Sequence, residues 1–265
     1  MENNNKGGVS LADIIQFQTR IMFGAQYGRI EKAKYEKSKD ELIIACLRMG
    51  WNDAFRHVTK NLDSVEADIK NHDSQKYELE DEFCLKRQRI ISHKKGRKEF
   101  DDYYSSILNC ETILSVFKKY ASAETTDEKC DIIINNIDRL SDEFQKVKEN
   151  ICFGHIQKLF NIAVKLYLCL YMCRIYLNID DELFYKDIEA ALETADCPID
   201  SIILDRFEQK KMKEKGIGKE HELLYPGFTW SQISSDEAIN TYKSIQKDFR
   251  SAGKSSLYFD FAEWN

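Results

Sequence analysis

Proline is scarce in this sequence, since Pro198 and Pro226 are the only two among 265 residues. Proline breaks helices because it lacks the backbone N–H and its ring collides with the preceding turn, so a long chain with few prolines favours helices. The sequence also lacks a clear alternation of apolar and polar residues, the pattern of strands, and it lacks internal repeats. We therefore predict an all-α fold.

Targeting and membrane signals are also missing. The chain starts with the polar segment MENNNKGG rather than a signal peptide, and its eight cysteines are scattered, so we expect reduced thiols in a cytoplasmic protein. The longest apolar run, residues 159–173, is shorter than the roughly 20 residues that span a bilayer. Lys165 interrupts this run. We predict a core helix and no membrane partner.

The composition allows a substantial core. Apolar residues make up 43% of the chain, enough for one large domain or two small ones. The net charge of −6 argues against wholesale wrapping of nucleic acid, but a local basic groove remains compatible with it because binding follows the local field.

Apolar residues recur at helical spacing along most of the chain. The predicted helices cover residues 10–22, 42–55, 103–120, 128–140, 142–151, 155–177, 183–194, 201–215 and, with turns, 230–253. We predict a disordered N-terminus at residues 1–9, an N-terminal helical region at 10–125 with a charged, basic helix, and a second helical region at 126–265.

A basic run, KRQRIISHKKGRK, occupies residues 86–98. Lysine and arginine at this density attract phosphate, although such runs also serve as solvated helix faces. Arg87 and His93 match the loose arginine–histidine spacing of HEPN-type ribonucleases, which are helical too. A HEPN-like ribonuclease is therefore one alternative function.

Two short cysteine pairings have the spacing of half a zinc site, Cys152 with His155 and Cys169 with Cys173. A second pair at a familiar spacing is not evident for either. We interpret them as core thiols and predict no metal and no cofactor.

The most apolar segment, FGHIQKLFNIAVKLYLCLYMC at residues 153–173, carries Lys158 and Lys165 on one stripe, because seven residues are about two helical turns. Gly154 precedes Lys158 by four residues, which predicts a tight turn and then a helix with lysine in its first turn. A cation there lies among unsatisfied amides and the positive end of the dipole. That position favours the neutral, nucleophilic amine.

Downstream, Asp200 follows Pro198 and Ile199 at the predicted start of a helix. Its carboxylate suits an N-cap, and it also suits a charged partner directed at the lysine. The sequence leaves both roles open.

Together these residues resemble the helix-hairpin-helix DNA glycosylases of the 8-oxoguanine class. The matching motifs are Gly154-x3-Lys158 before an apolar helix, Pro198-Ile199-Asp200, a second lysine at Lys165, and the segment LYFDFAEW at residues 257–264. The second lysine and the last segment are similar to the archaeal-type branch of that class.

The resemblance implies an enzyme, a DNA glycosylase with AP-lyase activity that acts on double-stranded DNA with a flipped base. It implies that Lys158 is the nucleophile, that Asp200 is its partner, and that Asp260 and Trp264 hold the extruded base. Gly154 and the hairpin amides would hold phosphate.

Lys165 would support the site by pairing with a carboxylate or by extending to the groove. Departures from the family pattern, a shortened hairpin (CFGH) and Tyr258 in place of histidine, leave the excised base open. Trp51 and Gln16 are further candidates for the base pocket. A divergent pocket also suits a role in defence against modified foreign DNA. The third alternative is a non-catalytic helical interaction module.

Overall fold

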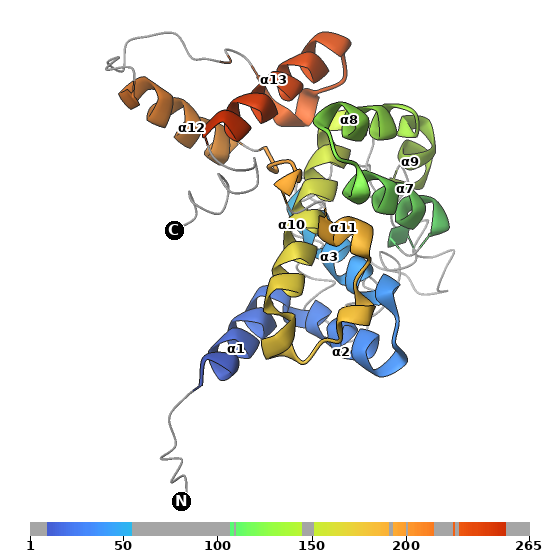
Figure 1. Ribbon diagram of the computed structural model, residues 1–265. Coiled ribbons are helices and arrows are strands. Elements are labelled where there is room, and N and C mark those ends of the chain that lie inside the picture. The colour runs from blue at the N-terminus through green and yellow to red at the C-terminus, as the bar shows by residue number, and fades with distance from the viewer. Residues whose placement is uncertain are drawn as a thin grey trace, which may run out of the picture.

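The computed structural model describes residues 10–54, 107–108, 110–144, 151–190, 193–199, 201–214, 225 and 228–252. Within these ranges it forms ten α-helices and three short 3-10 helices, and no strand, which confirms the all-α prediction (Figure 1). The elements are α1 (Leu11–Phe23), η1 (Gly24–Gln26), α2 (Tyr27–Glu36), α3 (Lys39–Ala54), α7 (Glu111–Ser122), α8 (Thr126–Ile134), α9 (Ile137–Phe144), α10 (Phe153–Leu177), η2 (Asp181–Leu183), α11 (Lys186–Ala190), α12 (Ser201–Glu214), η4 (Trp230–Gln232) and α13 (Asp236–Ala252).

Local capping signals set the starts of two helices. At α1 the hydroxyl of Ser10 accepts a hydrogen bond from the Asp13 N–H at 3.2 Å, and the Asp13 carboxylate accepts one from the Ser10 N–H at 3.0 Å. Thr125 and Glu128 make the same reciprocal pair at the start of α8. Such capping boxes satisfy amides that the first turn leaves without an intrahelical acceptor.

The predicted helix over residues 128–140 is interrupted in the structure, where α8 ends at Ile134 and α9 starts at Ile137. The side chain of Asn136 donates to the carbonyl oxygen of Ile132 at 2.8 Å. Asparagine side chains compete with the backbone for hydrogen bonds in this way and favour turns over helix interiors. Apolar spacing alone does not reveal such a break.

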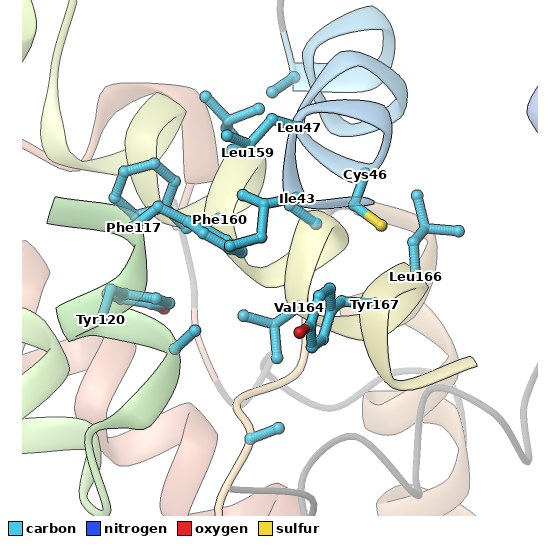
Figure 2. Packing of buried hydrophobic residues seen from close by; sticks show 14 of the residues in the cluster. Ile43, Cys46, Leu47, Phe117, Tyr120, Leu159, Phe160, Val164, Leu166 and Tyr167 are labelled. Atoms are coloured by element: carbon cyan, nitrogen blue, oxygen red, sulfur yellow. The ribbon is translucent and has the colours of Figure 1, made fainter. Parts of the chain in front are cut away.

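The long helix α10 forms the centre of the fold, with α3 along one side and α7 and α8 along another (Figure 1). Gly50 of α3 permits a close approach, because a Cβ at this residue would lie 2.7 Å from the carbonyl oxygen of Leu159. Figure 2 shows how side chains of the three helices meet: Ile43, Cys46 and Leu47 of α3; Leu159, Phe160, Val164, Leu166 and Tyr167 of α10; and Phe117 and Tyr120 of α7.

By length and apolar composition, α10 meets the requirements of a membrane-spanning helix, and half of its most apolar window is buried inside the protein. A core helix of a helical protein meets the same requirements. Here α10 packs against α1, α3, α7 and α8.

The core joins the two predicted helical regions. Helices α1 and α3, from residues 10–125, pack against α10, from residues 126–265, and their buried apolar side chains belong to one cluster. The domain boundaries themselves stay a prediction, and the basic segment 86–98 lies outside the described residues.

Candidate functional site

The start of α10 differs from the sequence prediction. The helix begins at Phe153 with Cys152 as its N-cap, two residues before the predicted start at His155. Gly154 is therefore inside the first turn, rather than in a preceding tight turn, and Lys158 is the sixth helical residue. Because a turn contains 3.6 residues, Lys158 lies in the second turn, beyond the amides that lack intrahelical acceptors.

Gly154 is required by the close approach of η4. A Cβ at this position would lie 1.7 Å from the carbonyl oxygen of Trp230, a backbone atom that a side-chain rotation cannot move away. The Gly154 N–H donates to the carbonyl oxygen of Ile233 at 3.2 Å, so the amide is already engaged. Gly154 thus allows the backbone of η4 to pack directly on the first turn of α10.

This packing places the indole of Trp230 against Lys158. The ammonium nitrogen lies 4.3 Å from the ring centroid, within the range of a cation–π interaction, and Lys158 is only 6% exposed. The imidazole of His155 meets the same indole edge-on, with ring centroids 5.8 Å apart. Lys158 is therefore a buried lysine covered by an aromatic ring, and not a surface lysine.

Sequence reasoning misses Trp230 and favours Trp264 as the aromatic of the site. The segment at 230–232 is a single 3-10 turn far from α10 along the chain, and periodicity carries no information about such a contact. The one related feature of the sequence is Gly154, because a glycine inside a helix often marks the close approach of another segment. Gly154 does not identify which segment approaches.

A thiol and an imidazole lie side by side at the same helix end. Cys152 Sγ is 3.0 Å from His155 Nδ1 and 3.2 Å from the carbonyl oxygen of Ser231. The sequence predicts no more for these two residues than a core thiol or half of a zinc pair. Among the described residues, no group of three or more His, Cys, Asp or Glu side chains has a metal-binding arrangement.

The segment before Asp200 is held against α10 one turn beyond Lys158. The side-chain amide of Asn161 donates to the carbonyl oxygen of Cys197 at 3.3 Å. Gln246 of α13 bonds both backbone groups of Cys197, since its side-chain amide donates to the carbonyl oxygen at 2.7 Å and its side-chain oxygen accepts from the N–H at 3.0 Å. Asp200 itself lies outside the described residues, so its distance to Lys158 stays a prediction.

A second buried group surrounds Asp196, which is 1% exposed. Thr126 and Arg250 donate to its carboxylate at 2.8 and 2.5 Å. Complete burial raises the pKa of Asp196 above its usual value, and the nearby Lys129 and Arg250 cations oppose that rise. Burial likewise lowers the pKa of Lys129, whose ammonium donates to the carbonyl oxygen of Thr194 at 2.8 Å.

The network continues from Asp196 to α7 and α10. Tyr242 reaches the Asp196 carboxylate at 3.5 Å and accepts from the Asn161 amide at 3.0 Å. Tyr120 donates to the Asn161 carbonyl oxygen at 2.6 Å. Because these buried polar groups satisfy one another, they fix the loop at 195–199 relative to α8, α10 and α13.

An open groove of about 870 Å³ is lined by residues in and beside η4 and by residues of α13. Thr229, Gln232 and Ile233 form one wall, and Glu237, Asn240 and Thr241 of α13 contribute to the other. This volume is in the range of sites that hold small molecules or single nucleotides, and most of these side chains offer uncharged hydrogen-bonding groups.

The other predicted residues divide into two groups. Lys165 is half-buried on α10, Trp51 is in the core with its ring centroid 5.4 Å from that of Phe144, and the Gln16 amide donates to the Tyr176 carbonyl oxygen at 2.9 Å. Trp51 therefore packs in the core rather than lining a base pocket. Asp260, Trp264, Arg87 and His93 lie outside the described residues.

The seven described cysteines, a set that leaves out Cys84, are free thiols. The chain matches no protein-family model, and comparisons with curated proteins and with solved structures give no match.

Proposed function

We propose that the protein is a DNA glycosylase with AP-lyase activity, and that Lys158 is its nucleophile. The observation that carries the proposal is the position of Lys158, buried under the Trp230 indole in the second turn of α10, with the segment leading to Asp200 fixed one turn away by Asn161. A buried amine beside an aromatic face and a motif with a carboxylate are the groups that base excision through a Schiff base requires.

In the proposed reaction the nucleotide is flipped out of the duplex, which costs a few kcal/mol of stacking and pairing. The neutral amine of Lys158 attacks C1′, the bond from C1′ to the base nitrogen breaks, and the base leaves with that electron pair. Opening of the sugar ring then gives an iminium between Lys158 and C1′. Loss of a proton from C2′ then forms the C2′–C3′ double bond and expels the 3′-phosphate, and this elimination cleaves the strand.

The indole of Trp230 covers the amine in this structure. When substrate binds, either the indole must move away or the flipped nucleotide must enter along the face of the indole. A flipped base stacks well on indole, and such stacking contributes about 1–3 kcal/mol per base. The groove lined by Gln232 of η4 and by α13 provides room for the extruded nucleotide close to the turn that carries Trp230. We therefore propose Trp230 as an aromatic contact of the base.

The remaining roles follow from the ordered motifs. Asp200 stabilises positive charge on the sugar and accepts the lysine proton, while Asp260 and Trp264 contact the base. Lys165, about two turns after Lys158 on α10, supports the site by pairing with a carboxylate or by extending to the groove. Gly154 positions η4, and phosphate is held by basic residues such as those at 86–98 and 210–219. The partner is double-stranded DNA, and no cofactor is required.

Borohydride trapping on duplexes that contain a panel of modified bases tests this proposal. The wild-type protein should form a covalent protein–DNA adduct with at least one duplex, because borohydride reduces the iminium to a stable amine. Lys158→Gln should abolish trapping. Lys165→Gln removes the other lysine of the same helix and should still trap, because a supporting lysine forms no bond to C1′.

Two results would contradict the proposal: no adduct with any duplex, or normal trapping by Lys158→Gln. An adduct lost only in Lys165→Gln would move the nucleophile to Lys165. A HEPN-like ribonuclease instead predicts RNA cleavage that His93→Ala abolishes and that Lys158→Gln leaves unchanged. A non-catalytic interaction module predicts neither activity.

A further inference from the structure

The side chains of Cys152 and His155 form a pair that the proposed base-excision reaction does not use. Sγ of Cys152 and Nδ1 of His155 are 3.0 Å apart, so one proton can be shared between them. The ring of His155 is held by its edge-on contact with Trp230, and Cys152 is held by the N-cap position of α10. The geometry is therefore fixed by elements outside the pair.

Two states of this thiol compete. When neutral, Cys152 donates to the carbonyl oxygen of Ser231, which is 3.2 Å from Sγ. When its proton moves to His155 Nδ1, the thiolate faces an imidazolium, an arrangement that stabilises thiolates in reactive cysteines. The second state requires the neutral ring to carry its proton on Nε2.

We propose that Cys152 is a nucleophilic thiol activated by His155, and that it is a modification site for small, soft electrophiles. Cys152 is only half-buried, whereas Cys46, Cys130 and Cys197 are buried. Burial raises the pKa of Cys46 and raises that of Cys130 to about 12, which keeps both as unreactive thiols.

The reaction with iodoacetamide illustrates the step. The thiol proton passes to His155 Nδ1, a sulfur lone pair forms a bond to the reagent's methylene carbon, and the carbon–iodine bond breaks to release iodide. The imidazolium then returns its proton to water. Sulfur is alkylated without any change in redox state, so no oxidant is needed.

The test is a brief iodoacetamide pulse on the native, full-length protein, followed by digestion and mass spectrometry of each cysteine peptide over a range of pH. Cys173 is the internal control, because it lies on the same helix, is also half-buried, and has a pKa raised by burial. We expect Cys152 to react about tenfold faster than Cys173 at pH 7. The pH at which the labelling rate of Cys152 reaches half its maximum should lie below the ordinary thiol pKa of about 8.5.

Equal labelling of Cys152 and Cys173, or a midpoint for Cys152 at or above about 8.5, would overturn the inference. His155→Asn tests the activating group, and it should lower the rate at Cys152 about tenfold while leaving Cys173 unchanged. An unchanged rate at Cys152 in that variant also overturns it. The wild-type comparison needs no variant to fold, and it is independent of DNA binding.

Discussion

Replacement of Gly154 by alanine tests the contact that builds the candidate site. The added Cβ would lie 1.7 Å from the carbonyl oxygen of Trp230, while real Cβ atoms essentially never approach closer than 3.0 Å. The difference of these two distances is 1.3 Å, so η4 has to move by at least that amount. The clashing atom is backbone, and therefore the whole turn at 230–232 must shift.

Several interactions are lost together in Gly154→Ala. The hydrogen bond from the Gly154 N–H to Ile233 contributes about 1 kcal/mol, and the stacking of Trp230 on Lys158 about 1 kcal/mol. Overpacking adds about 1–3 kcal/mol. Alanine has the better helix propensity by about 1 kcal/mol, which opposes these losses. We expect a net decrease of about 2–4 kcal/mol in the free energy of unfolding.

Urea unfolding followed by circular dichroism measures this change. Gly28→Ala is the matched control, because Gly28 lies within α2 and a Cβ added there would meet no neighbouring segment within 4 Å. That variant should gain about 0.5–1 kcal/mol from helix propensity. If the free energy of unfolding of Gly154→Ala is within about 0.5 kcal/mol of the wild-type value, η4 does not pack on α10 as described.

Two further predictions concern the buried polar network. Tyr120→Phe removes the hydroxyl that donates to Asn161 and should lower the free energy of unfolding by about 1 kcal/mol in the same assay; no change would show that this bond does not contribute. Because the pKa of Asp196 is raised on folding, the folded protein holds this proton at higher pH than the unfolded chain does. The free energy of unfolding of the wild type, relative to that of Asp196→Asn, should therefore fall as the pH rises from 3.8 through the raised pKa of the folded state. If this difference instead increases over the same pH range, the ion pair with Arg250 has a larger effect on the pKa than burial has.

The sequence predicts those elements whose cause is local. Helices α1, α10 and α12 lie where apolar spacing predicts helices, although α10 starts two residues before the predicted start, and Pro198 lies in the gap between the helices predicted at 183–194 and 201–215. The break at Asn136 is less visible, because it depends on one side chain competing for a carbonyl oxygen. Local patterns thus predict helices better than they predict where helices end.

The candidate site depends instead on contacts between distant segments. The place of Lys158 on the apolar helix singles it out in the sequence. Gly154 marks a close approach to this helix, but nothing in the sequence identifies Trp230 as the residue that covers Lys158. Asp196 stands four residues before Asp200 in the sequence, and only burial in the structure distinguishes Asp196. The candidate nucleophile and its helix are readable from sequence, whereas the packing that surrounds them comes from tertiary structure.

The most direct test of the central claim identifies the amine that forms the adduct. A duplex with an abasic site, where many amines react, is incubated with the protein, reduced with borohydride, and digested for mass spectrometry of the modified peptide. The account predicts that the DNA remnant is attached to Lys158 in the peptide that contains residues 153–165. Attachment to the N-terminal amine or to exposed lysines, with Lys158 unmodified, would contradict it.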